Sequence, residues 1–584
     1  MNHFISGIIK IIILEAQVGL LLLDAVTRDR FEKQKKIAFI VLSALMVFAW
    51  CDYGAFIRNG FTLVHHHEQF HFYLGAKYQA EVGWFDLYRA AVIADAETVR
   101  GLRVDQIRDN TTFDLEPTSK AFAERDRIVG RFTPQRWEEF KADWVLLMEP
   151  PNKAELNACE QTRCTDPGSM TQCRAACEQA RNDAYFQWRA RFNGVVQDHG
   201  NSNSPAWAVI AHPIARLVPF TPGGQAFLGL IDVALMVVLW WQIFKTFGWK
   251  PASIAMLVWA APPFVFSYLG GSFLRWDWLF ALGMACVMMK REKWLYAGLF
   301  FGFAVATKLF PLFFGVALGV RALLTCWRDK KVHQKYRQML AGTVISGTAI
   351  VALASIMFGG FWVWPEYQRR MQTTVRERFY SNQYSLRTVY LQWQVSLGCS
   401  MSDCRSENLE CSAAVCKGCC DPNGRRSIDS LASTWLFPAE MKQGRNDVDV
   451  ADHQFGLKLF QLLFTLAVFL LVLRTDEIGA FTLGPLLVCV WLVVNAYYWN
   501  MLGLVALGLA LREGQKPALG ALIGLHAMFM TYYLYVHTNR GMSEGYMVAL
   551  QLLLLIAVFA FFEYRAVKAE LMELFGTLSG RKRA

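Results

Sequence analysis

Titratable and aromatic side chains are concentrated between positions 65 and 88. The segment contains His65, His66, His67, Glu68, Gln69, His71, Tyr73, Lys77, Tyr78, Trp84 and Tyr88. A partly dry site beside a membrane strengthens the effect of every charge, so such groups are functional candidates. The structural alternative is an interfacial patch of aromatic and histidine side chains.

Residues 67–71 spell a HExxH motif, in which His67 and His71 could share a Zn²⁺ ion while Glu68 acts as a general base. The motif has three fixed positions and the region is rich in histidine, so the match is weak by itself. A zinc site also needs a third ligand. The nearest downstream acids, which lack a recognisable protease context, are Glu81, Asp86 and Glu97. We therefore predict no metal ligand and keep a membrane metalloprotease as an alternative function.

The overall composition is that of a polytopic membrane protein. Of the 584 residues, 54% are hydrophobic and only 18% are charged, which lies outside the range of soluble globular proteins. The net charge of +11 comes mostly from short Lys and Arg clusters beside apolar runs, where such charges orient a membrane chain. These features exclude a purely soluble enzyme and argue against nucleic acid as a partner.

The first apolar stretch differs from the others because polar residues interrupt it. Lys10, Gln17 and Asp24 recur every seven residues and therefore share one helix face. We expect an interfacial amphipathic helix and a basic cytoplasmic segment within residues 1–36. The first transmembrane helix is predicted at 37–57, because the basic residues before it place its start in the cytoplasm.

Beyond the first crossing, the pattern predicts two large external segments and eleven further transmembrane helices. Helices 2–7 fall within residues 225–364 and helices 8–12 within 456–564, with a basic cytoplasmic tail at 565–584. The external segments are 58–224 and 365–455. The expected fold class is an all-α polytopic membrane protein with about twelve transmembrane helices, an interfacial helix and two disulfide-containing external loops.

Both external segments hold an even number of cysteines. The first contains Cys159, Cys164, Cys173 and Cys177, and the second contains Cys399, Cys404, Cys411, Cys416, Cys419 and Cys420. Even counts on the oxidising side predict disulfides within each segment. A zinc knuckle at Cys416, Cys419 and Cys420 is the alternative. The remaining cysteines, Cys51, Cys286, Cys326 and Cys489, lie in or beside predicted spans and are expected to be inert packing residues.

Four fragments share their order and sidedness with one group of membrane enzymes. They are the acid-aromatic-glycine pattern from Glu68 to Tyr88, the Pro-aromatic segment 204–219, Lys-Leu-Phe-Pro at 308–311, and Asn-Gln-Tyr-Ser-Leu at 382–386. Through them most of the chain resembles the GT-C superfamily of membrane glycosyltransferases, and in particular its bacterial polyprenol-phosphate-mannose-dependent mannosyltransferase branch. Counting back from Tyr73 by the usual spacing of this branch lands on Gln69, so Glu68 takes the acidic position with a shift of one residue.

The resemblance implies a reaction at the outer face of the inner (cytoplasmic) membrane, where the donor is a sugar on a polyprenyl phosphate. It implies an inverting displacement in which Glu68 takes the acceptor proton, with Glu81 and Asp86 as less favoured bases. The cations expected to face the donor phosphate are Lys308, Arg275 and Arg387. Further candidates for substrate binding are His71, Tyr73, Lys77, Tyr88, Asp277, Asn382 and Gln383.

No cofactor is expected besides the lipid-linked donor, although a divalent metal is compatible with the pattern. The other expected partners are membrane lipids and an acceptor that could be a glycolipid, a glycan or a protein. A multispan transporter is the non-enzymatic alternative, because Asp232 and Lys458 lie in or near predicted spans.

Overall fold

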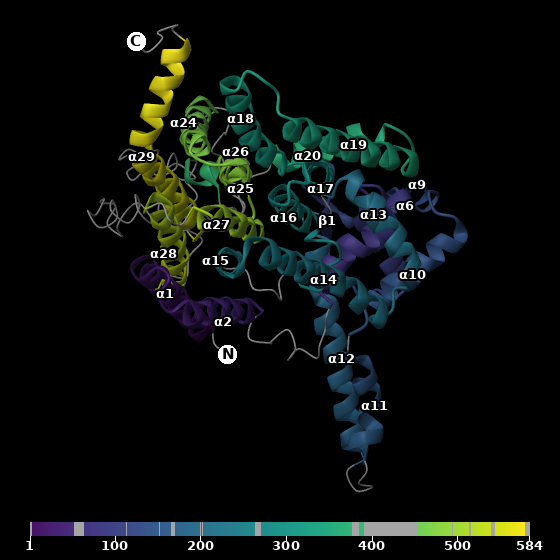
Figure 1. The fold of residues 1–584 in the computed structure, drawn as a ribbon. Helices are drawn as coiled ribbons and strands as arrows, with labels where there is room; N and C mark the ends of the chain where they lie inside the picture. The colour runs from purple at the N-terminus through teal and green to yellow at the C-terminus, as the bar shows by residue number, and fades with distance from the viewer. Residues whose placement is uncertain are drawn as a thin grey trace, which may run out of the picture.

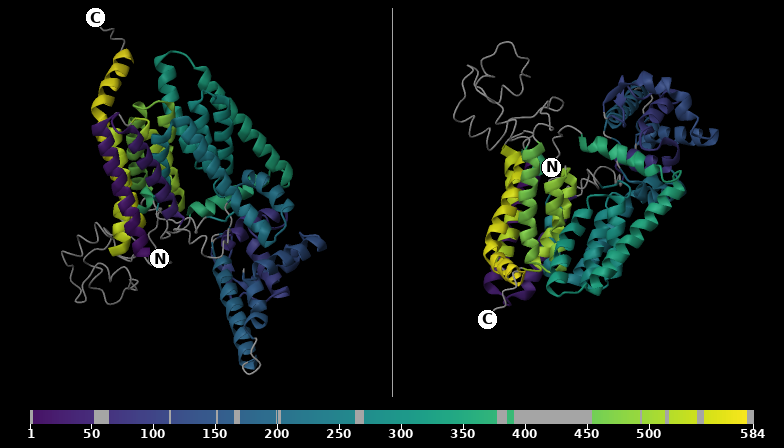
Figure 2. Two further views of the ribbon diagram at one scale, coloured as in Figure 1. Left: turned by 60° about the horizontal axis from the view of Figure 1, so that its bottom comes forward. Right: turned by 90° about the horizontal axis from the view of Figure 1, so that it is seen from above.

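The protein is built almost entirely of helices (Figure 1). The computed structural model describes residues 3–51, 64–112, 114–150, 152–164, 170–198, 200, 203–262, 270–376, 385–390, 454–492, 494–512, 516–538 and 544–578. These residues form a bundle of apolar helices and a smaller, more polar domain of residues 64–198, which we call the α4–α12 domain. Figure 2 shows this domain at one end of the bundle and the C-terminus at the other.

The apolar helices of the bundle overlap the ranges 225–364 and 456–564, where transmembrane helices 2–12 were predicted. In chain order they are α14 (Pro222–Phe247), α15 (Trp249–Ala260), α16 (Asp277–Lys290), α17 (Trp294–Thr307), α18 (Leu312–Arg328), α19 (Gln334–Met357), α24 (Gln454–Leu473), α25 (Glu477–Thr482), α26 (Gly484–Trp491), α27 (Leu502–Ala510), α28 (Lys516–Thr538) and α29 (Glu544–Leu578). Before α27 lies a short 3₁₀ helix, η4 (Ala496–Met501).

Five helices in the described part of the chain are long and apolar enough to cross a membrane. These stretches are Ile5–Thr27, Pro222–Phe247, Gln334–Met357, Phe455–Leu473 and Lys516–Leu534. Shorter apolar helices accompany them, which indicates a multi-pass membrane protein. The count of twelve crossings remains a prediction.

The polar residues of the N-terminal helix contact other parts of the bundle. α1 (His3–Thr27) includes one of the five candidate spans and packs along α28 and α2 (Glu32–Trp50). Its polar face is turned inward, because Gln17 Oε1 lies 2.7 Å from His526 Nε2 of α28 and Asp24 pairs with Lys35 and Lys250. The seven-residue spacing therefore marks an interhelical contact, which satisfies buried polar groups. The position of this helix relative to the membrane interface remains a prediction.

Glycines let two bundle helices approach each other closely. A Cβ atom on Gly298 of α17 would lie 2.1 Å from the Met339 carbonyl oxygen of α19, and one on Gly342 of α19 would lie 2.2 Å from the Leu295 carbonyl oxygen. Small residues are the usual means by which membrane helices bring their backbones together. This contact fixes the first part of α17 against α19, and Lys308 follows the other end of α17.

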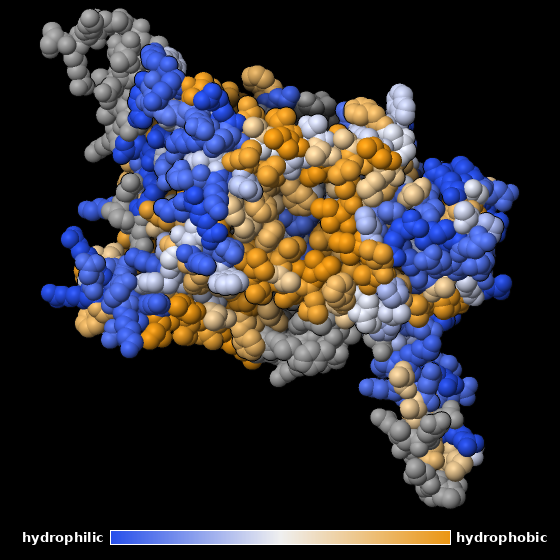
Figure 3. Space-filling model, turned by 45° about the vertical axis from the view of Figure 1, so that its right-hand side comes forward, coloured by the Kyte–Doolittle hydropathy of each residue, from blue (hydrophilic) through white to orange (hydrophobic). Residues whose placement is uncertain are grey.

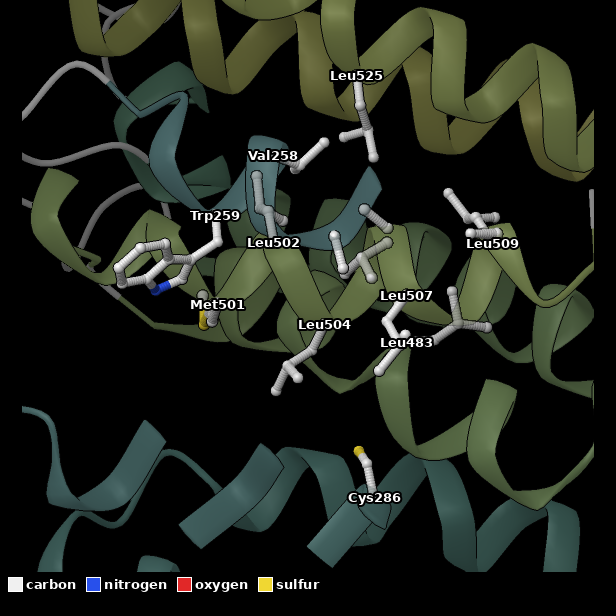
Figure 4. Packing of buried hydrophobic residues seen from close by; sticks show 14 of the residues in the cluster. Val258, Trp259, Cys286, Leu483, Met501, Leu502, Leu504, Leu507, Leu509 and Leu525 are labelled. Carbon is white, nitrogen blue, oxygen red and sulfur yellow. The ribbon is translucent and has the colours of Figure 1, made fainter. Parts of the chain in front are cut away.

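Leucine side chains fill the centre of the bundle. Figure 4 shows Leu502, Leu504 and Leu507 of α27 among side chains from α15, α16 and α28, including Val258 and Leu525. Outward-facing side chains are also apolar, and Figure 3 shows a broad hydrophobic face bordered by hydrophilic regions. A surface of this extent fits contact with lipid tails.

The α4–α12 domain consists of short helices around an aromatic core. Its elements are α4 (His66–Glu68), the π-helix η2 (Gln69–Leu74), α5 (Gly75–Lys77), α6 (Gln79–Val82), α7 (Leu87–Glu97), β1 (Gln106–Arg108), β2 (Leu115–Pro117), α8 (Thr118–Ala123), α9 (Arg125–Val129), α10 (Pro134–Leu147), α11 (Lys153–Arg163) and α12 (Met170–Val195). The antiparallel pair β1 and β2 departs from the all-α expectation. Two helices, α13 (Pro205–Leu217) and α20 (Val363–Arg376), contact each other beside the bundle.

Two disulfides cross-link α11 and α12, which project away from the rest of the molecule (Figures 1 and 2). Cys159 pairs with Cys177, and Cys164 pairs with Cys173. The prediction that these four cysteines pair among themselves is confirmed. The six cysteines of the second predicted loop lie outside the described residues. The other four cysteines of the chain are free, and Cys286 and Cys489 are buried, as expected for packing residues.

Candidate functional site

Glu68 lies where the chain changes from an α-helix to a π-helix. The chain turns from α4 into the π-helix η2 directly after Glu68, and His65 Nδ1 caps α4 by accepting a hydrogen bond from the Glu68 amide at 3.2 Å. A π-helix closes its hydrogen bonds one residue later than an α-helix, and such turns are frequent at functional sites.

The central contact of the site is an ion pair between Glu68 and Arg275. Arg275 Nη1 donates to Glu68 Oε2 at 2.7 Å, and the two side chains are only 14% and 12% exposed. The guanidinium also lies over the rings of Phe72 and Tyr497, 4.7 and 4.6 Å from their centroids. Three distant segments therefore meet at Arg275. The guanidinium thus pairs across the fold with Glu68 rather than with the nearby Asp277.

Asp232 of α14 holds the loop that presents Arg275. Its carboxylate accepts hydrogen bonds from the backbone amides of Arg275 at 2.8 Å and Trp276 at 3.0 Å. The preceding residue, Leu274, has φ 50°, a left-handed conformation uncommon for a non-glycine residue. Asp232 thus positions the backbone around Arg275. This role gives a structural reason for a buried carboxylate that the sequence also allowed us to interpret as a feature of a transporter.

Lys308 lies beside the same charges. It follows α17, and its Nζ donates to Asn203 Oδ1 at 2.6 Å. It also interacts electrostatically with Arg275, Asp277 and Glu68. Asp277 is buried at the start of α16, where its Oδ1 accepts from the Trp278 amide at 2.8 Å. The structure therefore brings together four of the residues selected from the sequence.

The electrostatic environment keeps Glu68 ionised. Burial by itself would raise the pKa of Glu68, but Arg275 and the neighbouring histidines hold it below the ordinary value of 4.5. Burial lowers the pKa of His71 to about 4, so this imidazole is neutral at neutral pH. A carboxylate held in its charged form can accept a proton.

His71 and Tyr88 form a second contact within the site. His71 Nε2 lies 2.7 Å from the Tyr88 hydroxyl, and the Phe70 ring stacks on Tyr88 with centroids 5.8 Å apart. On the other side of the motif, His67 Nε2 lies 3.0 Å from Asp198 Oδ2. Partial burial would lower the pKa of His67, but the contact with Asp198 raises it. The segment carrying Glu68 is therefore fixed from both sides.

Two other candidates serve the α4–α12 domain rather than the Glu68 cluster. Tyr73 donates its hydroxyl hydrogen to the Val218 carbonyl. Lys77 Nζ forms ion pairs with Asp143 at 2.6 Å and Glu139 at 2.8 Å. These contacts are structural in character, because they satisfy charged and polar groups inside a folded domain.

The two less favoured bases are also engaged in ion pairs. Glu81 binds Arg136 at 2.7 Å, and Asp86 binds both Arg127 and Arg131 at 2.9 Å. Each carboxylate is therefore held by arginines of α9, α10 or the connection between them. Glu81 and Asp86 therefore belong to ion pairs within the α4–α12 domain.

The candidates from the second predicted loop are only partly described. Asn382 and Gln383 lie outside the described residues. Arg387 belongs to the short helical segment 386–390, whose apolar side chains pack with α24, α26 and α29.

Sequence reasoning missed Asn203, Tyr497 and Asp198. Asn203 directly precedes the Ser-Pro-Ala-Trp fragment at 204–207, so the motif could have drawn attention to it. Tyr497 lies in a run of aromatic residues, and Asp198 follows a polar helix, so neither stands out in the sequence.

The fold and this charged cluster define a multi-pass membrane protein with a buried site where its apolar helices meet the α4–α12 domain. Residues 202–401 match the model of Glycosyltransferase family 87, a GT-C membrane glycosyltransferase family. The matched segment contains Arg275, Asp277 and Lys308, whereas Glu68 precedes it. No curated protein and no solved structure matched the chain. The similarity to membrane glycosyltransferases is thus confirmed over this segment, and the mannosyltransferase branch remains a prediction.

Proposed function

We propose that this protein transfers a sugar from a polyprenyl-phosphate-linked donor to an acceptor at the outer face of the membrane. The observation that carries the proposal is the buried Glu68–Arg275 ion pair, which joins a carboxylate to a cation of the matched segment. A base for the acceptor and a cation for the donor phosphate are the two groups that such a transfer needs.

The reaction is a single inverting displacement at the anomeric carbon. The acceptor oxygen forms a bond to this carbon as the bond to the phosphate oxygen breaks, and Glu68 takes the hydroxyl proton. The leaving group is the polyprenyl phosphate, whose growing negative charge is stabilised by Arg275 and Lys308. The apolar helices accommodate the polyprenyl chain.

The ion pair suggests how the base is kept ready. Without donor, Arg275 holds Glu68 in its ionised form. The donor phosphate brings a competing anion, so the guanidinium shifts part of its hydrogen bonding from Glu68 to the phosphate oxygens. This exchange frees the carboxylate to approach the acceptor hydroxyl.

The same ion pair favours a transferase over the metalloprotease alternative. In a zinc protease, the glutamate of HExxH must act on a metal-bound water. Here Glu68 Oε2 is bound to Arg275 at 2.7 Å. A guanidinium at this position suits an anionic substrate.

The test is Glu68→Gln, which keeps the shape of the side chain but cannot accept the proton. Sugar transfer from a radiolabelled polyprenyl-phosphate donor should fall by about 10²–10⁴-fold, the usual contribution of a general base. Donor binding should persist, because Arg275 and Lys308 remain. Glu116→Gln is the matched control: it breaks a second buried Glu–Arg pair of 2.7 Å, outside the site, and should leave turnover per folded molecule unchanged. Ordinary turnover in the Glu68→Gln enzyme would refute Glu68 as the base.

A further inference from the structure

Two histidines and an aspartate lie together next to Glu68. One ligand atom from each of His67, His71 and Asp198 falls within 4.8 Å of the other two. The imidazole centroids of His67 and His71 are 4.9 Å apart. His67 and Asp198 are 131 positions apart in the sequence and come from α4 and the turn after α12.

We propose that His67, His71 and Asp198 form a binding site for a divalent transition-metal ion of the Zn²⁺ class. Two imidazoles and one carboxylate are the donor types found in open zinc sites, where a water or an anionic oxygen completes the tetrahedron. Ligand atoms at about 2.0–2.2 Å from the metal lie roughly 3.4 Å from one another in a tetrahedron. Small side-chain rotations bring the present spacing to that value.

The surroundings suit such a site. The Tyr88 hydroxyl lies 2.7 Å from His71 Nε2 and fixes the orientation of this buried ring, as partners of metal-binding histidines do. The side chains of His67 and Asp198 are 38% and 42% exposed, which gives an ion access from solvent. His71 is therefore held in place, whereas His67 and Asp198 are accessible to an ion from solvent.

This site supplies what the sequence motif lacked. We predicted no metal because none of the acids near the HExxH motif stood out as a third ligand, and the fold brings Asp198 to that position. An ion there ties the segment that carries Glu68 to the end of α12 and adds positive charge beside the Glu68–Arg275 pair. The inference goes beyond sugar transfer and does not depend on it.

A second group of potential ligands is already occupied by other bonds. Cys164, Cys173 and Cys177 also lie within ligand spacing of one another, but all three belong to the disulfides between α11 and α12. A test for zinc must therefore keep the disulfides oxidised, because reduced thiols would bind the metal themselves.

The experiment uses the full-length protein in detergent, stripped with a chelator under oxidising conditions and titrated with Zn²⁺ alone by calorimetry. We expect one equivalent to bind. Asp198→Asn and His67→Ala should each weaken the affinity by more than about tenfold, since even outer-shell partners contribute that much. His66→Ala is the matched control and should bind normally, because His66 packs against Trp188 outside the cluster. Thermal unfolding of each stripped variant verifies its folding.

Co²⁺ substitution gives a second readout that does not involve activity. Absorption typical of tetrahedral Co²⁺ without thiolate charge transfer supports the His-His-Asp site, and loss of this absorption in the nearly isosteric Asp198→Asn assigns the ligand. Absence of Zn²⁺ binding by the wild-type protein refutes the site. Binding that is unchanged in both variants, or Co²⁺ spectra dominated by thiolate bands, also refutes it. Because binding is measured directly, a failed transferase assay leaves this conclusion unaffected.

Discussion

Arg275→Lys tests the proposed contact between Arg275 and the donor phosphate. The substitution keeps the positive charge next to Glu68 but replaces the planar guanidinium that lies between Phe72 and Tyr497. Lysine is a point charge that cannot bind a phosphate with two parallel hydrogen bonds or stack on both rings. We expect the catalytic efficiency for the donor to fall while Glu68 stays ionised.

The magnitude follows from the contacts that are lost. Each cation–π contact contributes about 0.5–2 kcal/mol, and a hydrogen bond to a charged group about 1.5–3 kcal/mol, of which lysine retains part. A net loss of about 1–3 kcal/mol corresponds to a decrease of about 5–150-fold in kcat/KM. Because the contact to the phosphate strengthens in the transition state, kcat should contribute to the decrease.

Arg136→Lys is the matched control, because Arg136 makes the same kinds of contact away from the site. It binds Glu81 at 2.7 Å and lies 4.4 Å from the centroid of the Tyr78 ring. Both variants should lose similar stability, measured by thermal unfolding in detergent, but only Arg275→Lys should lose donor-dependent transfer. Unchanged kcat/KM in Arg275→Lys, or equal losses in both variants, would refute a role for Arg275 in binding the phosphate.

Two further predictions concern stability. Burial would raise the pKa of Glu116, but Arg89 and a nearby lysine hold it below the ordinary value of 4.5. The charged form of Glu116 therefore stabilises the fold above pH 4.5. This stabilisation is lost as the pH falls through the lowered pKa. Glu116→Gln should therefore lower the free energy of unfolding by about 3 kcal/mol at pH 7. Chemical unfolding measured across acidic pH should show the difference in stability between variant and wild type becoming smaller as the pH falls. A difference that stays constant with pH would contradict this reasoning. Gly298→Ala should lower the free energy of unfolding by about 1–3 kcal/mol, because the added Cβ meets the Met339 carbonyl oxygen. The control Gly347→Ala places its Cβ in open space and should unfold at nearly the wild-type temperature. Equal unfolding temperatures for the two variants would contradict the close contact at Gly298.

Several features of this protein could be read from local sequence. Long apolar runs predict membrane helices because each backbone polar group must be satisfied within the lipid phase. The apolar helix α17, for example, lies within the range 225–364 predicted for transmembrane helices 2–7. The pairing of cysteines within the first segment predicted to be external followed from their even number. Glu68, Arg275 and Lys308 were selected through the resemblance to GT-C glycosyltransferases, and their roles remain predictions.

The tertiary structure decided which of these residues meet. The partner of Arg275 is Glu68, 207 positions away, rather than nearby Asp277, and no periodicity encodes such a contact. The seven-residue spacing of Lys10, Gln17 and Asp24 is the same whether this polar face contacts water or another helix. Only the tertiary structure shows that the face packs against α28.

The third ligand of the proposed metal site illustrates the same limit. A sequence motif specifies side chains one helical turn apart, because local hydrogen bonding fixes their spacing. Asp198 reaches His67 only because α12 returns the chain to the start of the α4–α12 domain. The sequence by itself therefore determined the elements and the types of charge, while long-range packing decided which charges share a site.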